Sequence, residues 1–160
     1  MNSAQAAIAL GSNLGNSRQI LEMAIDRLDN TPGIRVTGCS RWYRTVPIGP
    51  PQPDYLNGAV TLEVCHTPDR LLEILLNIET DFGRTRQQHW GPRTLDLDLL
   101  LFDRLILETP SLQIPHPRMR ERAFVLVPLA DLAPDWVEPV SEQTIAQLLQ
   151  SVDRSGILPI

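Results

Sequence analysis

The most constraining feature of the sequence is a short apolar stretch, residues 95–102, that carries two aspartates two positions apart, Asp96 and Asp98. Polar residues at alternate positions of a short apolar run predict a β-strand, because successive side chains of a strand point to opposite faces. The two aspartates therefore share one face, with Cα atoms about 6.6 Å apart, and the leucines between them share the other. Two carboxylates at this spacing repel each other unless a cation lies nearby. The spacing indicates a site for a hard divalent cation or a pair of them.

An Asp-x-Asp pair alone is more often a pair of surface charges on a half-exposed or edge strand, where charge prevents aggregation. The segment before it favours a functional site. Residues 84–95 contain three arginines and no acidic residue, although the chain has a net charge of −5. Trp90 lies among these arginines in a Gly-Pro loop, where a large apolar side chain is expected to close over a ligand. Arginines next to paired carboxylates indicate phosphate chemistry.

The basic residues of the chain are all arginines, fourteen in number. Without lysine, a phosphate loop of the Gly-Lys-Ser/Thr type and Schiff-base chemistry are excluded, so phosphates must be bound by arginines, backbone amides and metal. The net charge of −5 argues against a general nucleic-acid-binding protein, and no apolar run is long enough for a membrane span. With no recognisable secretory signal, we expect a cytoplasmic protein. Cys39 and Cys65 are then expected to be buried free thiols, although a disulfide between them stays open.

Hydrophobic periodicity predicts alternating strands and helices along a single domain, residues 1–160. The expected elements are, in order, a strand at 5–10, a helix at 18–28 capped by Asn16 or Ser17, a long strand at 34–44, a strand at 55–64, a helix capped by Thr67 or Asp69, the aspartate strand, and a final helix at 145–149. This order predicts an α+β fold with a ferredoxin-like βαββαβ core and C-terminal additions.

Five segments spread over nearly the whole chain form a recognisable set. They are Ala9-Leu10-Gly11-Ser12-Asn13-Leu14-Gly15, Tyr43-Arg44-Thr45, Pro53-Asp54-Tyr55-Leu56-Asn57, Trp90-Gly91-Pro92-Arg93-Thr94-Leu95-Asp96-Leu97-Asp98 and Pro115-His116-Pro117. Together they resemble the motifs of the 6-hydroxymethyl-7,8-dihydropterin pyrophosphokinase (HPPK) family of folate biosynthesis. The stretch from Arg93 to the paired aspartates is the signature of that family and is highly specific. The resemblance therefore outweighs the surface-charge interpretation of the two aspartates.

The resemblance implies a three-layer α-β-α fold and a single reaction. In this family the primary hydroxyl of the pterin attacks the β-phosphorus of ATP, and diphosphate is transferred whole as AMP leaves. The resemblance also implies that Asp96 and Asp98 hold two Mg²⁺ ions, which neutralise charge on the attacking and leaving oxygens. No side chain stands out as a general base.

The resemblance assigns roles to further residues on both sides of the reaction. On the ATP side these are Arg84 and Arg93, which are catalytic together with the aspartates and close over the nucleotide, His116 and Arg122, which contact its phosphates, and Glu79 beside it. On the pterin side they are Tyr55 and Phe124, which sandwich the ring, Asn57, which binds its polar edge, and Thr45, Val46, Ile48 and Trp90, which line or seal the slot. Aromatic faces and a polar edge suit a planar heterocycle.

Two other functions stay open on the residues alone. A non-catalytic pterin-binding protein would keep the aromatic slot but lose the metal ligands or the loop arginines, and this chain retains both. A different nucleotide-dependent transferase on the same scaffold would keep the aspartates but lack the pterin slot. We expect a monomer whose partners are ATP and the pterin, without nucleic acid or membrane.

Overall fold

A six-stranded antiparallel sheet forms the centre of the computed structural model, which describes residues 3–13, 15–46, 51–83 and 94–160. The strand order is β10-β3-β4-β1-β5, and β2 pairs with β4 along the same edge as β3. The strands are β1 (Ala4–Ser12), β2 (Ile34–Cys39), β3 (Tyr43–Thr45), β4 (Tyr55–Val64), β5 (Asp96–Phe102) and β10 (Ile157–Pro159). The fold is therefore a mixed α/β fold with a central antiparallel sheet.

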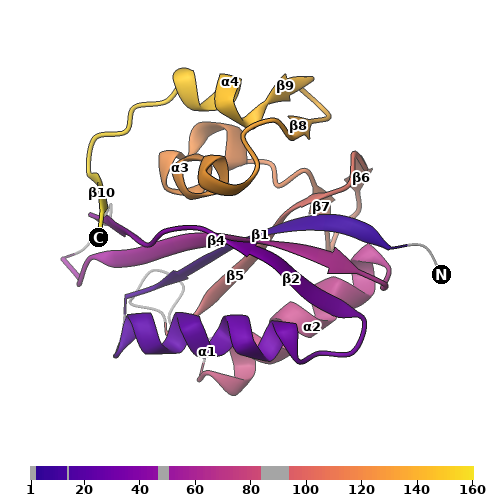
Figure 1. Cartoon of the computed structure of the whole chain (residues 1–160), viewed down its shortest axis with the longest axis horizontal. Helices are drawn as coiled ribbons and strands as arrows, with labels where there is room; N and C mark the ends of the chain where they lie inside the picture. The colour runs from indigo at the N-terminus through magenta and orange to yellow at the C-terminus, as the bar shows by residue number, and fades with distance from the viewer. Residues whose placement is uncertain (1–2, 14, 47–50, 84–93) are drawn as a thin grey trace.

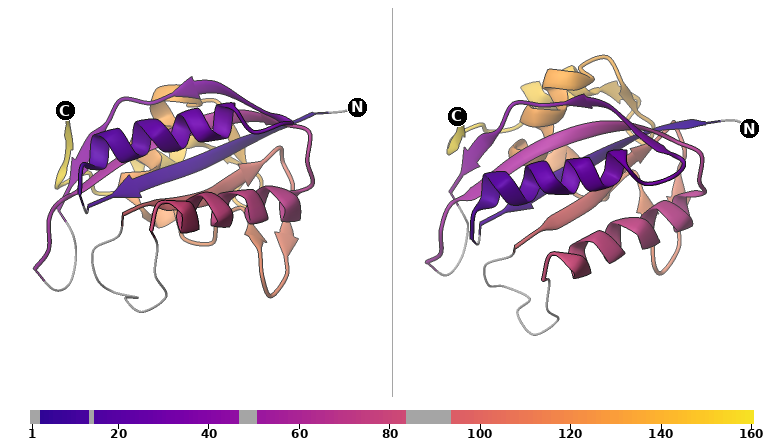
Figure 2. Two further views of the ribbon diagram at one scale, coloured as in Figure 1. Left: turned by 90° about the horizontal axis from the view of Figure 1, so that it is seen from below. Right: turned by 60° about the horizontal axis from the view of Figure 1, so that its bottom comes forward.

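Helices cover both faces of this sheet (Figure 1). On one face lie α1 (Ser17–Asp29) and α2 (Pro68–Asp81), which Figure 2 shows side by side. On the other face lie α3 (Ala123–Leu132) and α4 (Ile145–Gln150). Short elements complete the described chain: the hairpins β6 (Leu107–Glu108) with β7 (Gln113–Ile114) and β8 (Val137–Glu138) with β9 (Gln143–Thr144), and the 3₁₀ turn η1 (Met119–Glu121). None of the helices in this part of the chain is long and apolar enough to cross a bilayer.

The central strand β1 divides the interior into two hydrophobic clusters. Ala6, Ile8 and Leu10 belong to the cluster that α1 and α2 complete, whereas Ala7 belongs to the cluster under α3 and α4. This division follows from the two-residue period of a strand, which sends alternate side chains to opposite faces. Because both faces of β1 are covered, its sequence is apolar nearly throughout rather than alternating.

The helices begin where polar side chains can accept hydrogen bonds from their first free N–H groups. The side chain of Asn16 accepts from the Gln19 N–H at the start of α1, and Thr67 accepts from the Arg70 N–H at the start of α2. Such caps replace partners that the first turn of a helix lacks. These two helices and their caps confirm the sequence prediction.

The long strand expected at residues 34–44 is wrong in one respect, because the chain forms two strands, β2 and β3, with a break between them. Ser40 lies in the break, where its N–H donates to the Ala59 carbonyl and its Oγ accepts from the Ala59 N–H, both at 2.9 Å. The Trp42 ring packs on Gly58, where an added Cβ would lie only 2.4 Å from it. The side-chain hydrogen bonds and the bulky ring displace residues 40–42 from regular pairing.

The two cysteines differ from expectation in their burial. Cys39 is exposed at the end of β2 and Cys65 is half-buried, and both are free thiols. The expectation of two buried thiols is therefore wrong. Periodicity does not distinguish the outer edge of a sheet from its interior, and β2 lies at such an edge.

A buried carboxylate connects the β8–β9 hairpin to η1. Glu138 is fully buried, and its Oε1 accepts from Arg120 Nη1 at 2.6 Å. Its Oε2 accepts from the backbone N–H groups of Val140 and Ser141, the latter at 3.1 Å. Three donors on one carboxylate offset the cost of removing it from water.

We predict that Glu138→Ala lowers the free energy of unfolding by about 3 kcal/mol, because it leaves the Arg120 charge and two backbone N–H groups without an acceptor. Urea denaturation followed by circular dichroism measures this loss. The control is Glu63→Ala, which breaks the exposed pair between Glu63 and Arg35 and is expected to change stability by less than about 1 kcal/mol. Equal losses in the two variants would contradict the anchoring role of Glu138.

Candidate active site

A cavity of about 280 Å³ opens at one end of the sheet, on the face that α3 covers. The sheet is antiparallel, so the end of β1 meets the beginnings of β4 and β5, and the end of β3 also lies there. The start of α3 closes the cavity on the side opposite the sheet. The lining residues are Ala9, Leu10 and Gly11 of β1, Thr45 and Val46 at the end of β3, Tyr55 and Asn57 of β4, Asp96 and Asp98 of β5, and Arg122 and Phe124 at α3.

The register of β1 explains why a cavity exists at this place. Gly11 pairs with Asn57 of β4 on one side and with Asp96 of β5 on the other. Residues directly opposite each other in a sheet share a face, so Gly11 lies between two polar side chains. A Cβ at Gly11 would lie 2.9 Å from Asn57 Nδ2. The missing side chain of Gly11 therefore leaves the space that the Asn57 carboxamide occupies.

Asp96 and Asp98 lie on the cavity face of β5, while Leu97 and Leu99 pack in the opposite core. This arrangement confirms the alternation predicted from the sequence. Both aspartates are half-buried, so their carboxylates border the cavity without full loss of solvent. Across the described ranges no group of three or more histidine, cysteine or acidic side chains could hold a metal ion. Two hard oxygen donors fit Mg²⁺ nonetheless, because Mg²⁺ in proteins keeps water and is bound through one or two carboxylates together with substrate phosphates.

Glu79 supports the aspartate strand from the opposite side. It is buried in α2, and its Oε2 accepts from the Leu97 N–H at 2.7 Å. Leu97 stands between the two aspartates, so this hydrogen bond holds the backbone segment that carries both. The structure places the Glu79 carboxylate against β5 and not among the residues that line the cavity, and its contact with a nucleotide stays a prediction.

His116 and Arg122 bring donors to the same end of the sheet. The His116 N–H donates to the Leu100 carbonyl at 3.0 Å, which places the residue beside β5. Burial lowers the pKa of His116, and the charges of Arg122 and Arg118 lower it further, although Asp98 opposes them. Its Nδ1 accepts from the Arg118 N–H at 3.2 Å, so the neutral ring carries its proton on Nε2. His116 therefore presents an N–H donor, as a phosphate oxygen requires.

Two buried oxygens in the cavity wall lack a hydrogen-bond partner within the described part of the chain. They are Thr45 Oγ1 and Asn57 Oδ1. A buried polar atom without a partner costs free energy of about 1–3 kcal/mol, and native proteins keep such atoms rarely. Their presence side by side with Tyr55 and Phe124 indicates a ligand that is flat, partly apolar and bears hydrogen-bonding groups.

The structure thus brings most of the predicted site residues together. Thr45, Val46, Tyr55, Asn57, Asp96, Asp98, Arg122 and Phe124 line one cavity. Arg84, Arg93, Trp90 and Ile48 lie outside the described residues. Sequence reasoning did not assign Ala9, Leu10 or Gly11 to the site, since small and apolar residues of a central strand are typical of a core. Only the register with β4 and β5 shows that they form the floor of the cavity.

Comparison with known proteins relates this chain to one family. The sequence profile of the 7,8-dihydro-6-hydroxymethylpterin-pyrophosphokinase (HPPK) family matches residues 7–134. The 2-amino-4-hydroxy-6-hydroxymethyldihydropteridine pyrophosphokinase of Synechocystis sp. is 52% identical over 155 residues, which cover 97% of this chain and 80% of that protein. The enzyme of the same name from Pseudomonas aeruginosa is 47% identical over 151 residues, covering 94% and 93%.

Solved structures agree at the level of the fold. The crystal structure of an HPPK-DHPS in complex with substrates superposes with a TM-score of 0.74 at 15% identity, covering 94% of this chain and 43% of that one. The wild-type Plasmodium falciparum HPPK-DHPS with pteroate superposes with a TM-score of 0.75 at 14% identity, covering 93% and 42%. This chain thus spans less than half the length of these solved chains, and at such identities the likeness concerns the fold alone. From the matched profile and the close sequence relatives, the chain belongs to the 7,8-dihydro-6-hydroxymethylpterin-pyrophosphokinase family.

Proposed function

We propose that the cavity at the end of the sheet is the active site in which this pyrophosphokinase transfers diphosphate from ATP to 6-hydroxymethyl-7,8-dihydropterin, a step of folate biosynthesis. One observation carries the proposal: the paired carboxylates of Asp96 and Asp98 line the same cavity as Tyr55, Phe124 and Asn57. A phosphate-binding half and a heterocycle-binding half therefore adjoin. The reaction requires this, because the pterin hydroxyl must reach the β-phosphorus of ATP.

The pterin half lies between β4 and the start of α3. Tyr55 and Phe124 are proposed to contact the two faces of the pterin ring, with Val46 beside it. Asn57 and Thr45 are proposed to bind its polar edge, and the support is that Asn57 Oδ1 and Thr45 Oγ1 are buried without partners in the described chain. A pterin edge carries N–H groups that can donate to such oxygens. Ile48 and Trp90 complete this half as proposed from the family motif.

The nucleotide half lies along β5. Asp96 and Asp98 are proposed to hold two Mg²⁺ ions, which when bound neutralise the charge of the phosphates and polarise the β-phosphorus. His116 is proposed to donate its Nε2 proton in a hydrogen bond to a phosphate oxygen, and Arg122 to pair with phosphate charge. Arg84 and Arg93 are proposed as the catalytic arginines that close over ATP, and Glu79 as a neighbour of the nucleotide.

The chemistry is a displacement at phosphorus. The pterin hydroxyl oxygen bonds to the β-phosphorus while the bond from that phosphorus to the oxygen bridging to the α-phosphorus breaks, and AMP leaves with that oxygen. The residues of this chain contribute by holding the two substrates in line and by presenting donors to the phosphates. The proton of the hydroxyl passes to solvent, and no side chain is assigned as its base.

The finer description of the molecule belongs to the same proposal. The strand order β2-β4-β1-β5, with α1 and α2 on one face, supports a ferredoxin-like core within a three-layer arrangement. We propose a single domain over residues 1–160 that acts as a monomer in the cytoplasm, with ATP and the pterin as its ligands.

Among the tests of this function, the first prediction concerns the identity of the product. When ATP, Mg²⁺ and 6-hydroxymethyl-7,8-dihydropterin are mixed with the protein, AMP is expected to form in equal amount to the pterin diphosphate, without ADP. Chromatographic separation of nucleotides measures this, and omission of the pterin is the control. Release of ADP would indicate a different transferase, and pterin binding without any nucleotide turnover would indicate a non-catalytic binding protein. Removal of divalent cations with a chelator is expected to stop the reaction.

The second prediction concerns the carboxylate pair. Asp98→Ala and Asp96→Ala are each expected to lower turnover at saturating Mg²⁺ by a factor of at least about 10³, because each removes a ligand from the proposed cation site. Thermal unfolding is expected to stay close to that of the wild type, since the side chains are half-exposed. Asp26→Ala, at an exposed position of α1 on the far face, is the control and should keep full activity. Near-normal activity in the Asp98 variant would refute the metal assignment.

The third prediction concerns the floor of the cavity. Gly11→Ala is expected to weaken pterin binding by about tenfold or more, because the new methyl group would lie 2.9 Å from Asn57 Nδ2 and must displace it. Binding of ATP should change little. Isothermal titration with each substrate measures both constants. In an Asn57→Ala background the same glycine substitution should have a much smaller effect, and two independent, additive effects would contradict this contact.

A further inference from the structure

Two walls of the pterin half come from elements that are far apart in the sequence, β3 and α3. Thr45 lines the cavity from β3, and Phe124 lines it from α3. Tyr43 stands two positions before Thr45, so both side chains lie on the same face of the strand. Asp131 stands seven positions, about two helical turns, after Phe124 and therefore lies on the same side of the helix. β3 and α3 therefore also face each other at Tyr43 and Asp131, away from the cavity.

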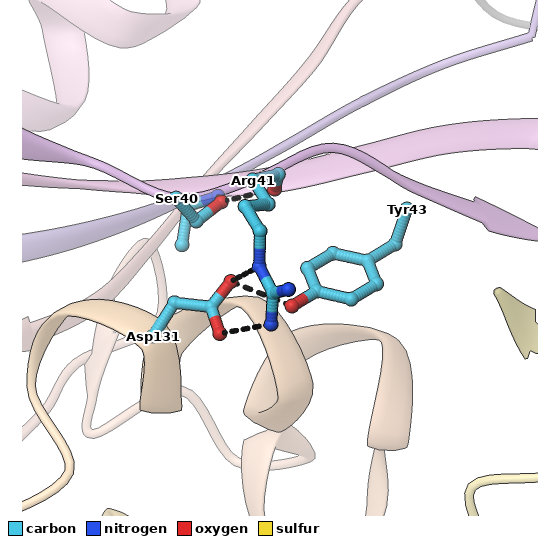
Figure 3. Close-up of polar contacts among 5 residues, drawn as sticks. Ser40, Arg41, Tyr43 and Asp131 are labelled. Atoms are coloured by element: carbon cyan, nitrogen blue, oxygen red, sulfur yellow. Dashed lines mark hydrogen bonds and ion pairs between the residues drawn. The ribbon is translucent and has the colours of Figure 1, made fainter. Parts of the chain in front are cut away.

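At this second place a hydrogen bond joins the walls (Figure 3). The Tyr43 hydroxyl donates to Asp131 Oδ2 at 2.6 Å, and Tyr43 is only 4% exposed. Arg41 completes the group: its Nη2 lies 3.3 Å from Asp131 Oδ1, and its guanidinium stacks 5.7 Å from the centre of the Tyr43 ring. We call Tyr43, Asp131 and Arg41 the β3–α3 clamp.

The members of the clamp differ in what they can contribute. Burial raises the pKa of Tyr43, and so do the hydrogen bond and charge of Asp131, so the phenol keeps its proton and donates at neutral pH. A short hydrogen bond to an ionised acceptor is stronger than one between neutral groups. Arg41 is 70% exposed in its side chain, so its ion pair is screened by solvent and contributes little. The directional restraint between strand and helix is therefore the bond from Tyr43 to Asp131.

We infer that Tyr43 and Asp131 are positioning residues that set the separation of β3 and α3, and thereby the distance of Phe124 from Thr45 and from Tyr55, which pairs with Thr45. Neither residue lines the cavity; they act through the two elements whose ends do. A planar ring held between walls loses contact energy steeply when the walls separate by a fraction of an ångström. The inference rests on the proposed pterin site and adds to it a specific effect on pterin affinity. Asp96, Asp98 and His116 of the nucleotide half lie on or beside β5, which the clamp does not contact, and Arg122 at the start of α3 is the exception.

The test compares binding of two ligands to Tyr43→Phe. Isothermal titration with 6-hydroxymethylpterin, in the presence of Mg²⁺ and a non-hydrolysable ATP analogue, is expected to show a dissociation constant about five- to tenfold higher than that of the wild type. Titration with the Mg²⁺–ATP analogue alone is expected to give a constant within about twofold of the wild type. If Tyr43 had a purely structural role, its substitution would weaken the binding of both ligands or of neither.

Substitutions at Asp131 make the test independent of how well one variant folds. Asp131→Asn keeps an oxygen that accepts from the Tyr43 hydroxyl and is expected to retain most of the pterin affinity, whereas Asp131→Ala is expected to lose as much as Tyr43→Phe. The double variant Tyr43→Phe with Asp131→Ala should be no weaker than either single variant, because both remove one hydrogen bond.

The matched control is Thr37→Val, which also removes one hydroxyl hydrogen bond in the sheet, from Thr37 to Thr61 Oγ1 at 2.8 Å, at a site away from the cavity. Its pterin affinity should equal that of the wild type even though thermal unfolding shows a comparable loss of stability. Wild-type pterin affinity in Tyr43→Phe, or an equal loss in Thr37→Val, would overturn the positioning role alone. Failure of the wild-type protein to bind the pterin would overturn the proposed function, and the slot with it.

Discussion

The cavity depends on the pairing of β1 with a different strand on each side. Gly11 lies opposite Asn57 in β4 and opposite Asp96 in β5, so one register places a residue of the proposed pterin half and a residue of the proposed nucleotide half in a single row. A slip of β4 and β5 by one residue against β1 would turn both polar side chains to the opposite face of the sheet. The apolar residues of β1 prevent such a slip, because Ile8 and Leu10 must stay under the helices α1 and α2. Burial of the core thereby determines the geometry of the site.

Local patterns made the regular elements and the orientation of Asp96 and Asp98 predictable. Strand alternation requires neighbours to point apart, and polar caps such as Asn16 and Thr67 mark where a helix begins, so neither inference needs knowledge of distant contacts. The family motif added the chemistry that periodicity cannot supply. The site residues that the resemblance assigned come from segments spread over the chain. Of those that the structure describes, all except Glu79 and His116 line one cavity.

Several features that escaped prediction depend on contacts between distant segments. The break between β2 and β3 arises where Ser40 forms hydrogen bonds with Ala59 and Trp42 packs on Gly58. No local sequence pattern predicts either contact. The bond from Tyr43 to Asp131 and the bond from Leu97 to Glu79 are of the same kind. An acidic residue on a helix is normally assigned to solvent. Only the packed arrangement of the sheet and helices shows that these carboxylates hold strands in place.

The central position of β1 also has a consequence for how the protein acquires its activity during folding. Its two partners, β4 and β5, follow much later in the chain, so the pairings that frame the cavity are non-local, and such contacts close late and slowly. An intermediate that has paired β1 only with β4 would have Tyr55 and Asn57 in place but not Asp96 and Asp98. The proposed site for both substrates is therefore complete only when β5 has also paired with β1. By mass action, the substrates then favour the native state over every partly assembled form, and substrate supply in the cell becomes a contributor to the lifetime of the enzyme.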